Sequence, residues 1–270
     1  MILINKPQGL TPLEVIQIFK DKYSSFKYKK LSYAGRLDPM AQGLLIILEG
    51  DENKNRRMYE SYDKTYEFSI LFGVSTDTYD LLGKITEVYK NPNTKIRNSK
   101  QIQMTKKQKV SDSEFRISNL LPTFLGKRMQ PYPPYSSKTA KGKPLYWWAR
   151  KNRLSEIVIP KKEVTISRLE LKRLYSKPVK DIKLEIFNKL SLIHGNFRQE
   201  EIKKGWKIFF KETKEKSFFL ADFTITCSSG TYVRALVNEI GEELDSTTTT
   251  FSINRIKIGE FMIEDSIKVD

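Results

Sequence analysis

Two stretches of this sequence alternate apolar and polar residues so regularly that they restrict the choice of fold class. Residues 65–74 place on one face the side chains of Tyr66, Phe68, Ile70, Phe72 and Val74. Residues 219–227 repeat the pattern with Phe219, Ala221, Phe223, Ile225 and Cys227. Because successive side chains of a strand point to opposite faces, each stretch predicts a strand with one buried face. The chain is therefore expected to build a sheet from segments far apart in sequence.

Helices separate these strands without a regular period. Residues 2–4 predict a short strand, and Thr11, Pro12 and Glu14 supply the parts of a helix N-terminal capping box. A helix is therefore predicted from Pro12 to about Lys22, with a buried stripe of Leu13, Ile16, Phe19 and Tyr23. Residues 228–230 turn the second alternating strand into a helix that ends near Leu244. This order favours a mixed-sheet α+β domain over a doubly wound fold.

Two stretches fit this pattern poorly and are expected to be insertions, near residues 90–112 and 176–216. Residues 95–109 carry six Lys and Arg residues and no acid, which predicts a flexible basic loop. After residues 111–113 a helix is predicted, bent at Pro122 and ending at Gly126, from the spacing of Ile117, Leu120, Leu121, Phe124 and Leu125. Residues 188–216 mix glycines and both charges, which predicts an irregular excursion or a β-hairpin.

The charge of the chain points to a polyanionic partner. Forty-eight Lys and Arg against 32 Asp and Glu give a formal net charge of +16. The only Cys and the only His, Cys227 and His194, exclude a disulfide framework and a Cys/His zinc site and disfavour a His-centred triad. The apolar run at residues 44–48 is too short to cross a bilayer, and residues 1–9 lack the layout of a signal peptide. We therefore expect a cytoplasmic protein.

Carboxylates, arginines and tyrosines remain as candidates for chemistry. Asp38 stands in a turn that begins at Gly35, just before the apolar run at residues 44–48. A carboxylate desolvated there needs a nearby cation to stay ionised. Arg234 follows the second alternating strand and can supply that cation if this strand lies next to the buried strand expected at residues 44–48. Taken alone, Asp38 is better explained by an Asx turn or a helix cap, and Arg234 by an exposed position in a first helical turn.

Taken together, the ordered motifs resemble the TruB family of tRNA pseudouridine synthases. The resemblance extends from Ile2 to about Phe261 and is carried by Lys6-Pro7-Gln8-Gly9-Leu10-Thr11, Gly35-Arg36-Leu37-Asp38-Pro39, Lys64-Thr65-Tyr66, Thr76-Asp77-Thr78-Tyr79-Asp80, Gln130-Pro131-Tyr132-Pro133-Pro134-Tyr135-Ser136-Ser137-Lys138 and Cys227-Ser228-Ser229-Gly230-Thr231-Tyr232-Val233-Arg234. It implies one catalytic domain over residues 1–270, with a mixed, largely antiparallel central sheet, flanking helices and the two insertions.

The resemblance also implies the roles of individual residues. Asp38 would be the catalytic aspartate that lets the uracil base leave the ribose, rotate and rejoin through C5. Arg234 would pair with Asp38, and Tyr66 would lie against the base and assist proton removal from C5. Tyr232 and Ile253 would wall the pocket. Neither a metal nor an organic cofactor is implied.

A basic and aromatic segment would clamp the RNA. Its cations are Lys138, Lys141, Lys143 and Arg150, interleaved with Tyr135, Tyr146, Trp147 and Trp148. The alternative is a solvated loop anchored by buried aromatic side chains. Asp77 and Asp80 would orient backbone or a neighbouring arginine.

Three features depart from the family pattern. Tyr33 stands where the family usually has a histidine beside the flipped nucleotides, so either Tyr33 takes over that stacking or the contact is lost. Arg36 makes the Asp38 motif resemble the ribosomal small-subunit pseudouridine synthases. Little chain follows Phe261, so no clear C-terminal RNA-binding domain is expected.

The expected activity is isomerisation of uridine 55 in the T arm of tRNA by a monomeric enzyme. One alternative is the same chemistry on ribosomal or guide-selected RNA. The other is a non-catalytic RNA-binding or RNA-folding module.

Overall fold

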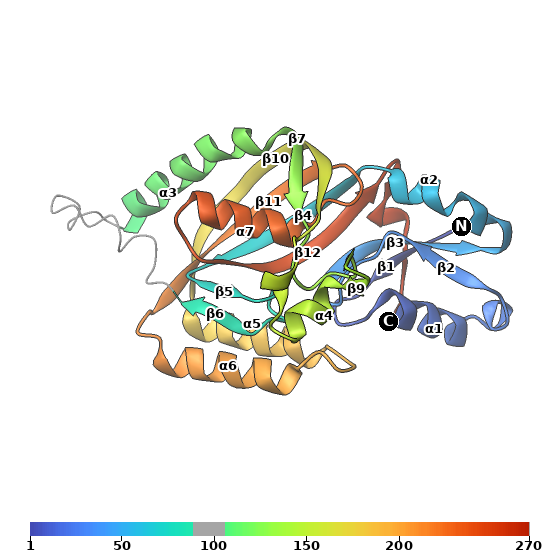
Figure 1. The fold of residues 1–270 in the computed structure, drawn as a ribbon, viewed down its shortest axis with the longest axis horizontal. Coiled ribbons are helices and arrows are strands. Elements are labelled where there is room, and N and C mark those ends of the chain that lie inside the picture. The colour runs from blue at the N-terminus through green and yellow to red at the C-terminus, as the bar shows by residue number, and fades with distance from the viewer. Residues whose placement is uncertain (89–105, 270) are drawn as a thin grey trace.

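A large mixed sheet forms the centre of the protein (Figure 1). The computed structural model describes residues 1–88 and 106–269, and the side chains of all of these except 106–111. Within this part of the chain the strand order is β14-β1-β3-β12-β4-β11-β10-β7, with β2 beside β3 and β13 beside β12. Only the pairs β1–β14 and β3–β12 run parallel among these described strands. The expected α+β fold with a mixed, largely antiparallel sheet is confirmed.

The sheet and two small hairpins, β5–β6 and β8–β9, account for the described strands. The strands are β1 (Ile2–Lys6), β2 (Leu31–Ala34), β3 (Ala41–Glu49), β4 (Lys64–Phe72), β5 (Val74–Thr76), β6 (Ile85–Val88), β7 (Gly126–Pro131), β8 (Thr139–Ala140), β9 (Lys143–Pro144), β10 (Lys161–Pro178), β11 (Ser217–Cys227), β12 (Thr248–Ile258), β13 (Phe261–Met262) and β14 (Ile267–Lys268). The α-helices are α1 (Pro12–Lys22), α2 (Arg56–Ser61), α3 (Lys106–Leu120), α4 (Leu145–Arg150), α5 (Val179–Ser191), α6 (Gln199–Glu212) and α7 (Val233–Glu243). None of the described helices is long and apolar enough to span a membrane.

The two alternating strands of the sequence are the central neighbours β4 and β11. Phe68 pairs with Phe223 across the antiparallel ladder, and their rings stack with centroids 5.1 Å apart. Their buried face packs against α3 and α7. The predicted alternation is confirmed up to Phe72, but Val74 joins a different cluster, because the chain turns at Gly73, whose φ is +100°.

Helix α1 begins where its capping signals predict and ends at Lys22, as expected. Thr11 and Glu14 form the reciprocal capping box, and Pro12 occupies the first turn. The predicted buried stripe is wrong at Leu13, whose side chain is 64% exposed, and Val15 is buried instead. The stripe starts one residue earlier than expected, at Pro12, and the helical period then brings Val15 inward.

Part of the predicted basic loop is helical. Residues 89–105 lie outside the described part, but residues 106–109 belong to α3, so the loop prediction is wrong for them. The expected bend at Pro122 is confirmed, because α3 ends at Leu120 and a 3₁₀ turn, Leu121–Phe124, follows. Ile117 and Phe124 are buried as predicted.

The prediction of an irregular excursion or β-hairpin over residues 188–216 is wrong, because α5 and α6 form a helical hairpin there. Ile202, Trp206 and Phe209 lie at helical spacing and are buried in a cluster that includes Leu220, on the opposite face of β11 from α7. Gly205 lies on α6 with open space around its Cα, so it weakens the helix without breaking it.

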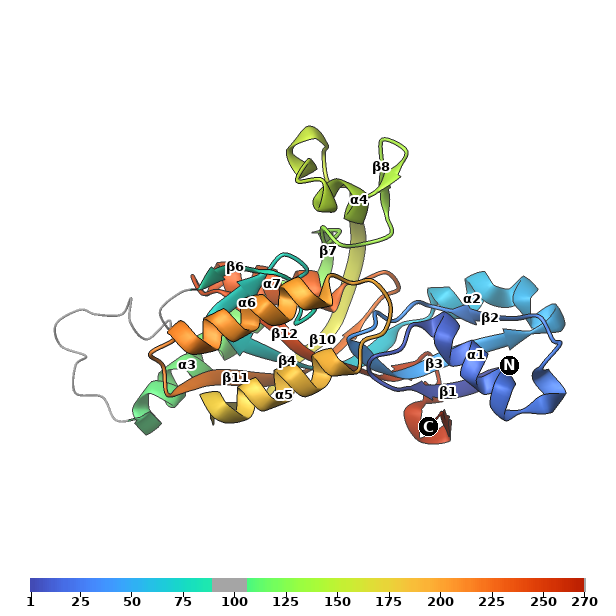
Figure 2. The same cartoon turned by 90° about the horizontal axis from the view of Figure 1, so that it is seen from below.

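Residues 132–160, between β7 and β10, form a segment that stands out from the sheet (Figure 2). This projecting segment contains β8, β9 and α4, and it rises on the long strand β10. It carries the four basic residues that the sequence assigns to an RNA clamp.

Candidate active site

The turn between β2 and β3 holds Asp38 in a fixed position. Gly35 enters the turn with a φ of +77°, and the backbone carbonyl of Asp38 accepts a hydrogen bond from Ala41 N at 3.0 Å. Gly9 N donates to the carbonyl of Pro39 at 2.9 Å, which ties the turn to the segment before α1. The Asp38 side chain remains 33% exposed, so its carboxylate is available to a ligand.

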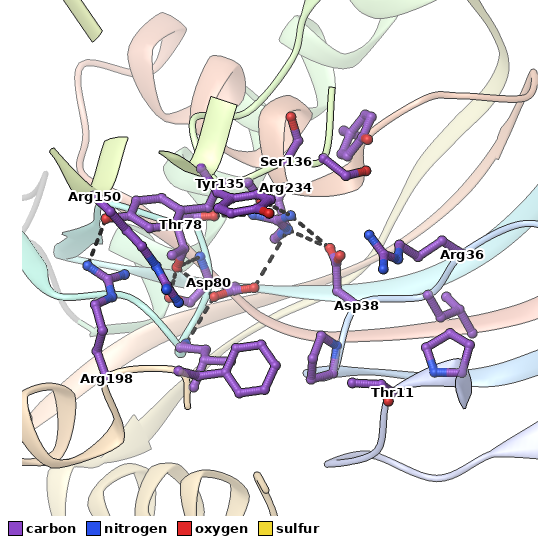
Figure 3. Close-up of a pocket in the computed structure, with 18 residues that line it drawn as sticks. Thr11, Arg36, Asp38, Thr78, Asp80, Tyr135, Ser136, Arg150, Arg198 and Arg234 are labelled. Atoms are coloured by element: carbon purple, nitrogen blue, oxygen red, sulfur yellow. Dashed lines mark hydrogen bonds and ion pairs between the residues drawn. The ribbon is translucent and has the colours of Figure 1, made fainter. Parts of the chain in front are cut away.

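The structure brings Arg234 of α7 to this carboxylate across 196 positions of sequence (Figure 3). Both Nε and Nη2 of Arg234 lie 2.8 Å from Oδ2 of Asp38. Nη1 of Arg234 donates to the backbone carbonyl of Thr78 at 2.5 Å, and Nη2 donates to that of Tyr135 at 3.4 Å. The guanidinium thus connects the Asp38 turn, the loop after β5 and the projecting segment.

Asp80 is the second carboxylate at this guanidinium. Its Oδ2 lies 3.6 Å from Arg234 Nε, and its side chain is buried. Burial raises the pKa of Asp80, and the charge of Arg234 opposes that rise. Burial also disfavours the charged form of Arg234, but Asp38 and Asp80 outweigh it and raise the pKa of the guanidinium. Asp80 therefore orients Arg234, in line with the role expected from the sequence.

Arg255 holds the Asp38 turn from the other side, and the sequence analysis did not identify it. Its side chain is buried on β12 and donates to the carbonyls of Leu44 at 2.7 Å and Gly35 at 3.1 Å. Burial lowers the pKa of this guanidinium. A Cβ at Gly43 would stand 2.4 Å from the Arg255 carbonyl, so glycine is what lets β3 approach β12. One signal in the sequence could have identified Arg255. It is a charged residue between Ile253 and Ile256, in a segment whose apolar residues predict a buried strand.

A cavity of about 580 Å³ opens on one side of Asp38. Four sequence-predicted residues line this cavity, which we call the Tyr66 cavity, together with Asp38 and Arg234: Tyr33, Tyr66, Tyr232 and Ile253. Burial raises the pKa of Tyr66, with Arg255 opposing, and burial raises that of Tyr232 to about 12. Both phenols are therefore neutral at physiological pH and present rings and hydroxyl groups to a ligand.

A second cavity, of about 310 Å³, lies beside the same carboxylate (Figure 3). It shares part of its wall with the Tyr66 cavity and extends to Arg198, in the connection between α5 and α6; we call it the Arg198 cavity. Arg198 pairs with Asp77 at 2.7 Å, so this aspartate also orients an arginine, as the sequence suggested. Sequence reasoning missed Arg198, because nothing in residues 188–216 indicated contact with the site.

The predicted clamp cations all lie on the projecting segment, and two of them line one of the two cavities beside Asp38. Lys138 lines the Tyr66 cavity and Arg150 lines the Arg198 cavity. Lys141 donates to the carbonyl of Glu156 at 2.9 Å, and Lys143 lies 5.8 Å from the centroid of a Trp147 ring. These two are on the outer surface of the segment and line neither cavity.

Lys6 is a buried cation near the site that the sequence analysis did not single out. Its side chain is 0% exposed, and Nζ donates to the carbonyls of Pro7 at 2.9 Å and Leu10 at 2.6 Å. Burial lowers the pKa of Lys6 to about 7, with the charge of Asp38 acting in the opposite direction. Among the described residues no group of three or more His, Cys, Asp or Glu side chains is placed to hold a metal ion.

Comparison with solved structures identifies the fold. A crystal structure of a Cbf5–Nop10–Gar1 complex matches with a TM-score of 0.53 at 15% identity, covering 99% of this chain and 51% of that chain. A structure of an H/ACA ribonucleoprotein bound to a substrate RNA containing 2′-deoxyuridine matches with a TM-score of 0.50 at 14% identity, over 99% and 50%. The chain thus spans about half the length of these structural relatives and has their fold.

Comparison of sequences identifies the family. The tRNA pseudouridine synthase B of Aquifex aeolicus (strain VF5) is 29% identical over 269 residues, covering 100% of this chain and 71% of the relative. That of Caldanaerobacter subterraneus subsp. tengcongensis is 31% identical over 265 residues, covering 98% and 70%. The model of the TruB family pseudouridylate synthase (N terminal domain) matches residues 23–189. With its Asp38–Arg234 pair at the edge of a tyrosine-lined cavity, the chain belongs to the TruB family of pseudouridylate synthases.

Proposed function

We propose that this chain converts uridine to pseudouridine at position 55, in the T arm of tRNA, with Asp38 as its catalytic residue. The observation that carries the proposal is the Asp38 carboxylate, which faces the Tyr66 cavity while Arg234 holds one of its oxygens. Relatives that match nearly the whole chain are tRNA pseudouridine synthases, which supports tRNA as the substrate.

The reaction needs a flipped base, a carboxylate and a path for one proton. A base inside a folded loop must leave its stack to be reached, and the aromatic wall of the Tyr66 cavity replaces the lost stacking. With Asp38 assisting, the bond from N1 to C1′ breaks, the uracil rotates, and a bond from C5 to C1′ forms. C5 loses its proton and N1 gains one, so substrate and product are isomers and no co-reactant is consumed.

Each wall residue has a role in this scheme. Tyr66 lies against the base and assists removal of the proton from C5. Tyr232 and Ile253 confine the ring as it rotates, and Tyr33 stacks on a neighbouring flipped nucleotide. Arg234 keeps the Asp38 carboxylate in position, because the guanidinium is buried and bonded on several sides.

The projecting segment binds the RNA backbone. Lys138, Lys141, Lys143 and Arg150 neutralise phosphates, and the rings beside them stack on unpaired bases. The proposal also comprises a single catalytic domain over residues 1–270 with additions near 90–112 and 176–216, a monomer, and action in the cytoplasm.

Two observations favour a second candidate, the same chemistry on another RNA. Arg36 follows the pattern of ribosomal small-subunit synthases, and the solved structural relatives belong to complexes that contain partner proteins or RNA.

Tritium release from C5-labelled uridine decides between tRNA and another RNA as the substrate. We expect release from an isolated T-arm stem-loop. Activity on ribosomal fragments with none on the stem-loop would contradict the tRNA assignment, and RNA binding without release on any RNA would indicate a non-catalytic module.

A further inference from the structure

The connection between α5 and α6 contacts the surroundings of the active site at both of its ends. At its first residue, the carbonyl of Leu192 is so near Gly9 that a Cβ on Gly9 would stand only 2.4 Å from it. Gly9 in turn donates its N–H to the carbonyl of Pro39 in the Asp38 turn, at 2.9 Å. At its last residue, Arg198 reaches the loop after β5 and the projecting segment. The connection therefore runs along the edge of the site from the Asp38 turn to the projecting segment.

Arg198 joins three elements through one guanidinium. It donates to both carboxylate oxygens of Asp77, in the loop after β5, at 2.7 and 3.2 Å, and to the hydroxyl of Tyr135, on the projecting segment, at 2.7 Å. The Arg198 side chain is only 16% exposed and lies 4.4 Å from the centroid of the Tyr135 ring. Its φ of +63° is a backbone conformation that persists only where neighbouring contacts enforce it. These contacts form only when all three elements are in their present positions.

Other contacts of the helical hairpin support the same junction. Nη2 of Arg150, in α4 of the projecting segment, donates to the carbonyl of Asn196 in the connection at 3.3 Å. Nε1 of Trp206, buried on α6, donates to the carbonyl of Leu81 in the loop after β5, also at 3.3 Å. The hairpin thus holds both the loop and the projecting segment.

Tyr135 connects this junction to the Asp38–Arg234 pair. Its hydroxyl accepts the hydrogen bond from Arg198, and its backbone carbonyl accepts one from Nη2 of Arg234 at 3.4 Å. The projecting segment stands out from the sheet on β7 and β10, so contacts such as these decide how it lies over the site (Figure 2). A change at Arg198 is therefore transmitted to the segment, and through it to the surroundings of Arg234.

We propose that Arg198 is a positioning residue that holds the projecting segment over the Asp38–Arg234 pair before RNA binds. Nη1 and Nη2 of Arg198 already donate to protein acceptors, so the residue acts through Tyr135 and not through a contact with RNA. Without Arg198, the free protein spends part of its time with the segment displaced, and binding has to restore its position. Bound RNA then holds the segment through its cations, so the chemical step is preserved. The inference rests on the proposed function for the RNA and the reaction used in its test.

Amide hydrogen exchange of the RNA-free protein tests the position of the segment. Arg198→Met removes the donors, and Arg198→Lys keeps the charge without the fork. The control is Lys177→Met, which breaks the ion pair between Lys177 and Glu185 on the same hairpin, outside both cavities. We expect exchange over residues 132–160 to be about 10-fold faster in Arg198→Met, intermediate in Arg198→Lys and unchanged in the control.

Two outcomes of the exchange experiment would overturn the proposal. One is wild-type exchange of residues 132–160 in Arg198→Met. The other is an equal acceleration in the central strands β4 and β11, because that would show a general loss of stability and not a displaced segment.

Binding and single-turnover tritium release on a T-arm stem-loop test the consequence for function. We expect the dissociation constant of Arg198→Met to rise by about 10-fold, while release at saturating RNA stays within about threefold of wild type. Tyr135→Phe removes only the acceptor hydroxyl and should cause part of the same loss. Combined with Arg198→Met it should add little, because both changes remove one contact.

The two experiments together separate positioning from direct RNA contact. Weaker binding by Arg198→Met without faster exchange in the free protein would show that Arg198 itself contacts RNA, and would overturn the proposal. If wild type neither binds nor converts the stem-loop, the proposed function fails. The exchange experiment uses no RNA, so it still decides whether Arg198 positions the segment.

Discussion

Arg234 directs two donors, Nε and Nη2, at the same carboxylate oxygen of Asp38, each at 2.8 Å. The other oxygen, Oδ1, receives no hydrogen bond from any residue that the structure describes. The Arg234 side chain is only 5% exposed, so the protein holds the guanidinium in place. The Asp38 side chain is 33% exposed, so its carboxylate faces the two cavities. The pair therefore holds Asp38 through Oδ2 and leaves Oδ1 available for the substrate contact that the proposed function requires.

Replacement of Arg234 tests that arrangement. Arg234→Gln leaves Asp38 and the buried Asp80 without their cation, and Asp80, whose pKa burial already raises, loses the charge that opposes the rise. Breaking a buried pair on one side costs about 3–5 kcal/mol, and we expect turnover to fall by about 100-fold or more. Arg234→Lys keeps the charge but not the forked geometry and should recover only part of both losses. Urea unfolding and tritium release measure the two effects, and a Gln variant with wild-type turnover would refute the role of the pair.

The buried Lys6 predicts a pH dependence of stability. Burial lowers its pKa from 10.5 to about 7 in the folded protein, so between these values the unfolded chain binds more protons than the folded one. The contribution of Lys6 to the free energy of unfolding therefore rises with pH from about 7 to about 10. Lys6→Met should flatten the stability profile over this window, as followed by urea unfolding. Parallel profiles for the variant and the wild type would contradict the shifted pKa.

Substitution of glycine by alanine is expected to lower stability at Gly43 and to raise it at Gly205. Gly43→Ala places a Cβ 2.4 Å from the Arg255 carbonyl at a φ of +110°, and we expect a loss of about 3 kcal/mol with lowered turnover, because β3 and the Asp38 turn move. Gly205→Ala, in α6 with open space at the Cα, should raise stability by about 0.5–1 kcal/mol and leave turnover unchanged. Thermal unfolding of both variants checks the signs, and a stabilised Gly43→Ala would show that the close approach of β3 and β12 is misplaced.

The projecting segment predicts the salt dependence of RNA binding. Each phosphate contact contributes about 0.7–0.9 to the slope of the logarithm of affinity against the logarithm of salt concentration. Lys138→Ala and Lys143→Ala should each lower that slope by about one contact. Lys207→Ala, on the exposed face of α6, is the matched control and should leave it unchanged. Filter binding over a salt series measures the slope. If Lys138→Ala and Lys143→Ala had the same slope as the control Lys207→Ala, the projecting segment would not be part of the RNA interface.

Local patterns in the sequence were sufficient for the two central strands and for the first helix. The alternation of β4 and β11 and the capping box at Thr11 are properties of neighbouring residues, and these elements lie where expected except that β4 ends at Phe72. The requirement that a partly desolvated carboxylate has a cation nearby allowed Arg234 as the partner of Asp38 only if the two strands were neighbours, and β3 and β11 are separated by β12 and β4. The motif resemblance, and not the local pattern, implied that Arg234 pairs with Asp38.

Tertiary context decided the features that sequence patterns missed. The α5–α6 hairpin contains Gly205 and charges of both signs, and its helices are stabilised by the burial of Trp206 rather than by local propensity. Lys6 and Arg255 resemble surface residues in sequence, because only the folded chain shows that backbone carbonyls satisfy their charged groups. The contact of Arg198 with Asp77 joins segments that no local pattern connects.

The most direct test of the account is pseudouridine formation by Asp38→Asn on a T-arm stem-loop, measured by tritium release together with the affinity for the same RNA. The substitution keeps the size of the side chain and removes the charge that the reaction requires. We predict no detectable release and a dissociation constant within about threefold of wild type, because Asp38 acts on the transition state and not on RNA binding. Wild-type release by Asp38→Asn would contradict the central claim that this carboxylate performs the reaction.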